Sequence, residues 1–292
     1  MKRILLLLVL TTALAGTTQA QRATKKLKRQ IAALIQGFHG EIGVYVKDLR
    51  HGSSLSIAGD SIFPTASMVK VPILIGIMEK IQRGELDYHQ SLVYKDSLLY
   101  PGVDILGSFK SGEKIELSEV MMLMLTMSDN TASLWLQSLA GGGSVINGIL
   151  DSLGFTVTRV NSRTPGREEA RDRYGWGQTS PREMAALLEK IYRRQILGDS
   201  ACIRMMRELG RDYWDEEAIS AIPPTIAVFA KSGAVDASRS EVILVNVPRH
   251  PYVLCICTNH NQDQSWEYGN EAWVLTRKLS RLVWKHFAPH YD

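Results

Sequence analysis

The chain has 292 residues, a formal net charge of +4 and an apolar share of 45%. This balance is ordinary for a globular protein, and the basic run at 25–29 reads as a solvated helix face because no nucleic-acid recognition motif accompanies it. The three cysteines include two that are only two residues apart, which argues against a disulfide framework, and none has zinc-site spacing. We therefore expect no metal, no cofactor and no nucleic-acid partner.

The first residues have the features of a secretory signal peptide. Lys2 and Arg3 give a positive start, residues 4–10 are apolar, and small residues end at Ala20. The pattern predicts a signal peptide over 1–20, too short to span a membrane, with a membrane anchor or a buried helix as the alternatives. We expect a secreted or periplasmic bacterial protein with no membrane span after cleavage, and a monomer by default.

The expected elements form three groups along the chain. Helical spacing covers 24–38, strand-like alternation covers 41–49, and a hairpin partner follows at 53–59. From 67 to about 215 the pattern is mostly helical. Strand-like runs then return, and an amphipathic helix closes the chain; these segments cover 225–233, 241–248, 252–259 and 270–287.

Strands at both ends of the chain must pair with one another to satisfy their backbone groups. This predicts an α+β fold: a five-stranded antiparallel sheet flanked by the terminal helices, with a mostly helical inserted lobe. We expect a single catalytic domain over 21–292. Its α/β lobe would comprise 21–66 and 216–292, its helical lobe 67–215, and a site is expected at their junction.

The segment "PTASMVKVPILIGIMEKI" places Ser67 and Lys70 three residues apart at the start of a long apolar helix. Residues at this spacing share a helix face. A serine hydroxyl becomes nucleophilic when a base takes its proton, and a partly buried lysine with a lowered pKa is such a base. Lys70 as one more solvated charge is the competing interpretation. Pro72 must lie close to the helix start, because it removes a helix hydrogen bond.

The second motif, Ser128-Asp129-Asn130, lies in a predicted turn between two helices. Its simplest role is a helix cap, in which Asp129 or Asn130 accepts from free N–H groups of the next helix. A catalytic role would instead give Ser128 a proton relay and Asn130 a contact with a substrate amide.

The third motif, Lys231-Ser232-Gly233, ends the apolar strand "TIAVFA". A lysine there can simply mark the exposed end of the strand. A strand edge with a lysine, a hydroxyl and a glycine also suits an extended substrate, since glycine permits close approach and lysine attracts a carboxylate.

The order and separation of the three motifs resemble those of the penicillin-recognising serine hydrolases, specifically the class A β-lactamases. Further segments, including "TSPREMAALLEKI" and "SRSEVILVNVP", resemble that family in the same order. The resemblance implies a hydrolase that opens the amide bond of penicillins and cephalosporins through a serine acyl-enzyme.

By this resemblance Ser67 is the acylated nucleophile, and Lys70 is its proton acceptor or relay. Ser128 would pass a proton to the lactam nitrogen. The backbone N–H groups of Ser67 and Ala234 would form the oxyanion hole.

The resemblance also implies the substrate contacts. Asn130 would hold the side-chain amide of the substrate, and Lys231 with Ser232 would bind its carboxylate. Arg239 would be a second carboxylate contact, with a surface arginine in a hairpin as the alternative.

One loop departs from the family pattern. Where class A enzymes carry the glutamate that activates the deacylating water, the alignment places Thr164, and it places Glu168 where they have an asparagine. Residues four apart share a helix face, so we predict that Glu168 is the deacylating base, with Glu169 as a second candidate. In the alternative, both are loop charges paired with nearby arginines.

Two further functions stay open on the sequence alone. One is a D-alanyl-D-alanine peptidase or a related cell-wall serine hydrolase. The other is a penicillin-binding or sensor protein that is acylated and deacylates slowly, since a missing base would stall the second step.

Overall fold

The structure is a computed structural model that describes residues 23–291. The predicted signal peptide over 1–20 therefore lies outside the described residues. Within 23–291 no helix is long and apolar enough to cross a membrane.

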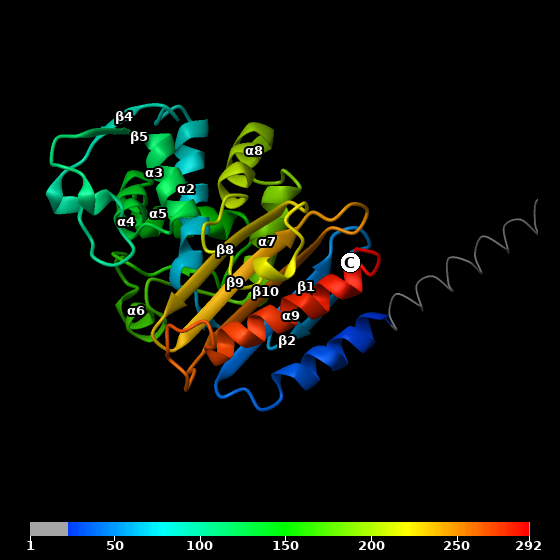
Figure 1. Ribbon diagram of the computed structural model, residues 1–292. Helices are drawn as coiled ribbons and strands as arrows, with labels where there is room; N and C mark the ends of the chain where they lie inside the picture. The colour runs from blue at the N-terminus through cyan, green and yellow to red at the C-terminus, as the bar shows by residue number, and fades with distance from the viewer. Residues whose placement is uncertain (1–22, 292) are drawn as a thin grey trace, which may run out of the picture.

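A five-stranded antiparallel sheet forms the centre of the molecule, as predicted, with the strand order β2-β1-β10-β9-β8. The first and last strands of the chain thus lie beside each other in the middle of the sheet (Figure 1). The strands are β1 (Glu41–Asp48), β2 (Ser54–Ile57), β8 (Val228–Val235), β9 (Ser238–Val245) and β10 (Tyr252–Asn259).

Side-chain alternation in these strands separates two apolar cores, one on each face of the sheet. In β1, Val44 and Val46 belong to the core under the terminal helices, whereas Tyr45 belongs to the core that faces the helical region. Cys255 and Cys257 share a face of β10, with 3.7 Å between their sulfur atoms, and both are buried free thiols.

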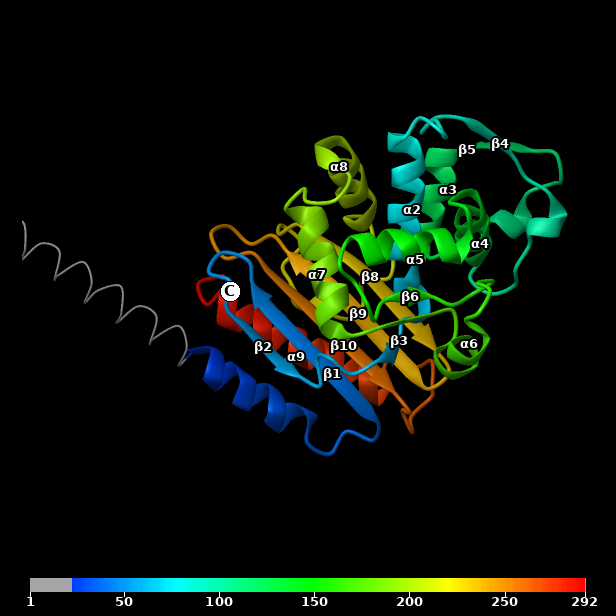
Figure 2. The same ribbon diagram turned by 180° about the vertical axis from the view of Figure 1, so that it is seen from behind.

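Helices cover both faces of the sheet. Residues 23–35 and α9 pack on one face (Figure 1), and α7 packs on the other, in front of the sheet in Figure 2. The helices are α2 (Lys70–Gln82), α3 (Leu117–Thr126), α4 (Asn130–Leu139), α5 (Gly142–Ser152), α6 (Glu168–Tyr174), α7 (Pro181–Tyr192), α8 (Gly198–Leu209) and α9 (Glu271–Phe287).

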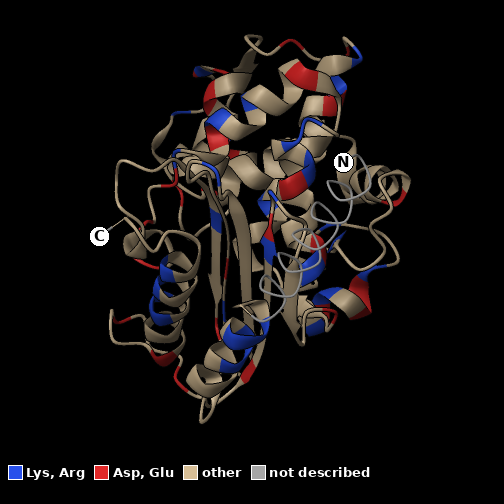
Figure 3. Ribbon diagram, turned by 90° about the vertical axis from the view of Figure 1, so that its right-hand side faces the viewer, with Lys and Arg blue, Asp and Glu red and all other residues tan. Residues whose placement is uncertain are grey.

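Short elements complete the chain. The two-residue and three-residue strands are β3 (Phe63–Pro64), β4 (Ser91–Val93), β5 (Lys114–Glu116), β6 (Arg159–Val160) and β7 (Gly177–Thr179). The 3-10 helices are η1 (Ala66–Val69), η2 (Asp96–Leu98), η3 (Leu106–Ser108) and η4 (Ile219–Ala221). On the side shown in Figure 3, acidic and basic residues intermingle over the helices.

Helix α2 is the axis of the helical region. Its first nine residues are buried, and Gly76 brings α2 close to α5, since a Cβ at Gly76 would lie 2.8 Å from Ile146. Pro72 is the third residue of α2, where a missing N–H costs no helix hydrogen bond. The start of α2, with Lys70 at its first position, is thus buried in the interior.

Candidate active site

A cavity of about 980 Å³ opens where η1, the turn before α4, the loop before β7 and the edge of β8 meet. Six of the nine predicted site residues line it; they are Ser67, Ser128, Asn130, Ser232, Ala234 and Arg239. The remaining three, Lys70, Lys231 and Glu168, do not line it, for different reasons.

Ser67 and Lys70 meet through a 3-10 turn. Ser67 lies in η1 rather than in the α-helix predicted from the sequence, and side chains three apart are eclipsed in a 3-10 helix. Lys70 Nζ lies 2.9 Å from Ser67 Oγ. The backbone of Ala66, directly before the serine, has a φ of +43°, a strained value for a residue with a side chain. The nucleophile candidate thus sits on a turn held in place by the surrounding fold.

The same amine also contacts the second motif. Lys70 Nζ lies 3.0 Å from Ser128 Oγ, 2.6 Å from the Ser128 carbonyl oxygen and 3.0 Å from Asn130 Oδ1. Ser128 has a φ of +61°, which turns its carbonyl and hydroxyl toward the same nitrogen. One nitrogen therefore bridges the two hydroxyl groups.

The surroundings of Lys70 favour its neutral form. Its side chain is fully buried, and this burial, followed by repulsion from Lys231, holds the pKa of Lys70 well below the usual lysine range. Asp129 and Asp212 oppose the shift without cancelling it. A neutral amine at hydrogen-bond distance can take the proton of the Ser67 hydroxyl.

Asp129 is a helix cap, as its simplest interpretation predicted. Its Oδ1 accepts from the N–H of Ala132 in the first turn of α4, and its Oδ2 accepts from the N–H of Leu106, 3.0 Å away. Asp129 therefore ties the loop before η3 to the turn that carries Ser128 and Asn130.

The edge of β8 closes the cavity opposite Ser67. A Cβ at Gly233 would lie 2.5 Å from the carbonyl oxygen of Thr65 and 2.9 Å from the backbone nitrogen of Ser67, so only glycine allows this approach. The backbone of β8 at Gly233, the residue before Ala234, therefore lies directly against the backbone of Ser67.

Lys231 lies beneath this edge. Its side chain is fully buried, and Nζ has no hydrogen-bond partner among the described residues. The carboxylate of Asp212 is 3.9 Å away, and burial raises the pKa of Asp212 even though Lys231 opposes the change. Asp212 also accepts from the N–H of Ser232 at 3.4 Å. Lys231 thus supplies positive charge from below the cavity surface that Ser232 forms.

Arg239 is held by the backbone. Nη1 donates to the carbonyl oxygens of Asp236 and Ser238, and Nη2 donates to those of Gln264 and Ser265. The guanidinium also lies 4.4 Å from the Trp266 ring centroid, and only Nε–H lacks a partner. Arg239 is therefore buried rather than a surface arginine, and its paired donor fork is already occupied.

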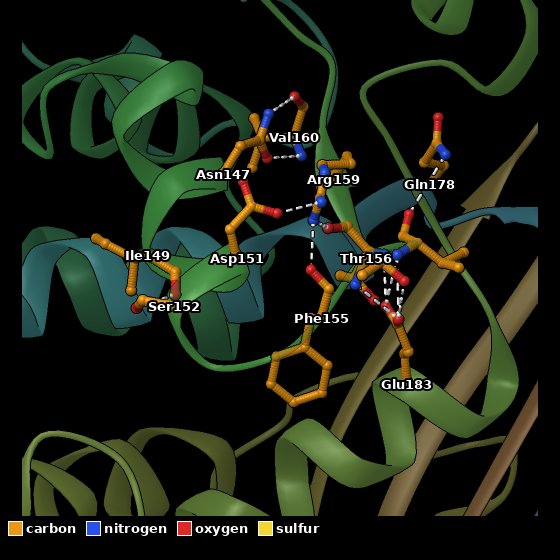
Figure 4. Close-up of polar contacts among 12 residues, drawn as sticks. Asn147, Ile149, Asp151, Ser152, Phe155, Thr156, Arg159, Val160, Gln178 and Glu183 are labelled. Atoms are coloured by element: carbon orange, nitrogen blue, oxygen red, sulfur yellow. Dashed lines mark hydrogen bonds and ion pairs between the residues drawn. The ribbon is translucent and has the colours of Figure 1, made fainter.

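The segment 156–160, which leads into and forms β6, is anchored by several polar contacts (Figure 4). Asn147 of α5 exchanges two hydrogen bonds with the backbone of Val160, at 2.8 and 2.9 Å. Arg159 pairs with Asp151, and Glu183 of α7 accepts from the backbone N–H of Thr158 and its two predecessors. These contacts fix the point from which the loop that carries Thr164 and Glu168 begins.

Glu168 is not brought to the cavity. It is exposed, accepts from the N–H of Gly166 at 3.1 Å, and its pKa is lowered by backbone hydrogen bonds. The prediction that Glu168 shares a face with Thr164 required a continuous helix, but α6 begins only at Glu168, and Gly166 has a φ of +77°. The premise of a continuous helix from Thr164 to Glu168 was therefore wrong. The role of Glu168 as the deacylating base stays a prediction, and no contact between Glu168 and Ser67 supports it.

Thr164 occupies a tight position. It is buried, donates to the carbonyl oxygen of Ser162, and packs so closely on α5 that a Cβ at Gly143 would overlap it. Arg167 turns inward instead, where it donates to Asn161 and Gln178. No carboxylate of this loop lines the cavity among the described residues.

The sequence interpretation missed all of the acidic residues that line the cavity, among them the buried carboxyl group of Glu241. Glu241 of β9 is opposite Ser232 in the sheet, its Oε2 accepts from the N–H of Ala218, and its Oε1 has no partner in the described chain. Burial, with Asp212 and Glu217 nearby, raises the pKa of Glu241 to about 8. The sequence signal that could have identified Glu241 is its place opposite Ser232 of the Lys-Ser-Gly motif. That signal can be used only if the pairing register of β8 and β9 is known.

The Glu241 carboxyl gives a pH prediction for stability. In the folded protein it keeps its proton up to about pH 8, whereas the unfolded chain loses it near the ordinary glutamate pKa of 4.5, so the free energy of unfolding falls as pH rises through this window. We expect Glu241→Gln to match wild type at pH 5 and to be more stable at pH 9, by on the order of 2–4 kcal/mol. Urea unfolding at several pH values measures the difference.

The exposed Glu41 provides the control, and Glu41→Gln should follow the wild-type curve at every pH. Parallel curves for Glu241→Gln and wild type from pH 5 to 9 would contradict a buried, protonated Glu241.

Comparison with known proteins agrees with this geometry. The model of the beta-lactamase enzyme family matches residues 26–287. Beta-lactamase ROB-1 of Haemophilus influenzae is 27% identical over 86% of this chain and 83% of its own length, and beta-lactamase AER-1 of Aeromonas hydrophila is 25% identical over 85% and 83%.

Solved structures share the fold. A mutant of PBP-A, solved as an acyl-enzyme complex with penicillin G, superposes with a TM-score of 0.79 at 26% identity, covering 91% of this chain and 97% of that one. The TLA-1 extended-spectrum beta-lactamase has a TM-score of 0.80 at 17% identity, over 90% and 99%. With Ser67 and Lys70 in contact and a family match over residues 26–287, the chain belongs to the beta-lactamase enzyme family and is a serine hydrolase of β-lactams.

Proposed function

We propose that the protein opens the β-lactam ring through an ester on Ser67. Ser67 Oγ attacks the lactam carbonyl carbon while Lys70 takes the hydroxyl proton. The C–N bond then breaks, and Ser128 delivers a proton to the departing nitrogen. The observation that carries this proposal is the position of Lys70 Nζ, within 3.0 Å of both serine hydroxyls, so that one buried amine connects proton removal to proton delivery.

The binding contacts follow the same assignment. The N–H groups of Ser67 and Ala234 receive the carbonyl oxygen, and Asn130 receives the side-chain amide through its free amide N–H groups. Ser232 binds the ring carboxylate above the charge of Lys231. Arg239 adds positive charge from behind the cavity surface rather than a two-pronged contact, because its Nη groups already donate to backbone carbonyl oxygens.

We further propose that deacylation is the slower step. Hydrolysis of the ester needs a water activated by a base. Thr164 has no basic group and Glu168 is exposed, so neither provides a base for this step in the described arrangement. Lys70, the titratable group hydrogen-bonded to Ser67, is then the base for this step as well.

A chromogenic cephalosporin tests both proposals. We expect a rapid burst of about one equivalent of product per enzyme, then slow steady turnover, with the acyl adduct visible by intact-mass spectrometry during the slow phase. Ser67→Ala should show neither adduct nor colour. Fast turnover with no detectable adduct would contradict slow deacylation. The absence of both colour and adduct in wild type would contradict the function itself.

The location of the protein is also a proposal. Its named relatives are bacterial β-lactamases. Together with the sequence of residues 1–20, this supports export to the periplasm or beyond, with cleavage after Ala20.

A further inference from the structure

The cavity continues past Ser232 into a region that the reaction above does not use. Its wall is formed by one continuous segment, Asp212–Glu217, together with the start of α9. We name the four carboxylates of this segment the acidic rim: Asp212, Asp215, Glu216 and Glu217. Asp212 accepts from the N–H of Ser232, so the acidic rim adjoins the place proposed for the ring carboxylate.

Two of these four charges are compensated. Asp212 lies 3.9 Å from Lys231, and Glu217 pairs with Arg277 at 2.9 Å. Asp215 and Glu216 are exposed, and their side chains have no ion pair or hydrogen bond within residues 23–291. The acidic rim therefore presents two uncompensated negative charges to the cavity.

A buried oxygen in the same region also lacks a partner. Glu241 is only 3% exposed, lines the cavity and has no partner for Oε1 among the described residues. Burying a polar atom without a partner is costly, so a water or a polar group of a bound molecule is expected to satisfy this oxygen in the cavity wall.

Exposed aromatic rings surround the carboxylates. Tyr213 and Trp214 are 62% and 42% exposed, and Trp266 and Tyr268 are 64% and 65% exposed. All four line the cavity. Tyr268 already has a cation on its face, with the Arg277 guanidinium 3.9 Å from the ring centroid. Aromatic faces beside carboxylates are the environment that binds organic cations.

We propose that this end of the cavity binds a positively charged substituent of the substrate, so that cationic cephalosporins are preferred over uncharged analogues. This inference rests on the proposed function. In a cephalosporin the C3 substituent is attached to the carbon next to the one that bears the ring carboxylate. A carboxylate at Ser232 therefore places the C3 substituent beside the acidic rim, which Ser232 adjoins.

Two cephalosporins with the same thienylacetamido side chain test the preference. Cephaloridine carries a pyridinium group at C3, and cephalothin carries a neutral acetoxy group. The measured quantity is the ratio of the second-order acylation constants for cephaloridine and cephalothin. At low salt we expect this ratio to be about fivefold higher in wild type than in Asp215→Asn/Glu216→Gln. Comparing the two enzymes cancels the intrinsic reactivity of the compounds, and at about 0.5 M salt the difference should shrink.

The matched control is Glu41→Gln/Asp96→Asn, which removes two exposed carboxylates that do not line the cavity. It should keep the wild-type ratio, and cephalothin should react equally with all three proteins. An equal cephaloridine-to-cephalothin ratio in wild type and the Asp215/Glu216 variant would overturn the inference. If neither compound acylates wild type, the proposed function fails instead.

Discussion

Lys70→Met is expected to lower the acylation constant by about three orders of magnitude, the range of a lost general base. Methionine keeps the length and burial of the side chain but cannot take the Ser67 proton or connect it to Ser128. Stopped-flow measurement of the chromogenic burst gives the rate. A Lys70→Met protein that acylates at the wild-type rate would remove Lys70 from the chemistry.

A variant of the second buried lysine, Lys231, distinguishes the effect of positive charge from that of base catalysis. Lys231 has no contact with Ser67 but is the second cause, after burial, of the low pKa of Lys70. Lys231→Met should therefore still acylate, with weaker substrate binding. Acylation requires neutral Lys70, so its rate rises with pH, and loss of the repelling charge should move that rise to higher pH. An unmoved pH profile in Lys231→Met would contradict this coupling.

Thr164→Glu is expected to speed deacylation by at least about tenfold, because it adds a carboxylate where related enzymes are expected to have their water-activating base. Thr164 is packed against Gly143 on one side, so the longer side chain must turn away from α5. The decay of the acyl adduct, followed by intact-mass spectrometry after excess substrate is removed, measures the step.

Thr164→Gln is the matched control, since it has the same shape and no basic group. Equal decay of the adduct in the two variants would mean that the carboxylate does not reach the ester. Faster decay in Thr164→Glu alone would identify the missing base as the cause of slow turnover.

Most of the fold could be predicted from local patterns in the sequence. The strand predicted at 252–259 forms with those bounds, and the helix predicted at 270–287 begins one residue later. Both have a clear apolar period, and a period is a property of neighbouring residues. The pairing of terminal strands followed from the need to satisfy their backbone groups, which is a constraint on the whole chain rather than on any one segment.

The site was predictable where it depends on sequence neighbours. Ser67 and Lys70 meet because they are three residues apart, even though a 3-10 turn replaces the expected α-helix. The same spacing argument did not hold for Glu168, because Pro165 and Gly166 lie between it and Thr164. Both residue types interrupt helices, and both are visible in the sequence.

Contacts between distant segments could not be predicted from the sequence. The indoles on Arg239 come from a loop and helix start more than twenty residues later, and the neighbours of Glu241 come from two other segments. Such contacts depend on register and loop path, which periodicity does not specify.

The place of β1 in the sheet has a consequence for folding during synthesis. Glu41 pairs with Asn259, so a ribosome must finish nearly the entire polypeptide before the central ladder can close. Contacts this distant in sequence delay folding. A nascent chain without its last strands therefore cannot complete the central sheet, which would keep it in a form that can be threaded through a channel if the protein is exported as proposed.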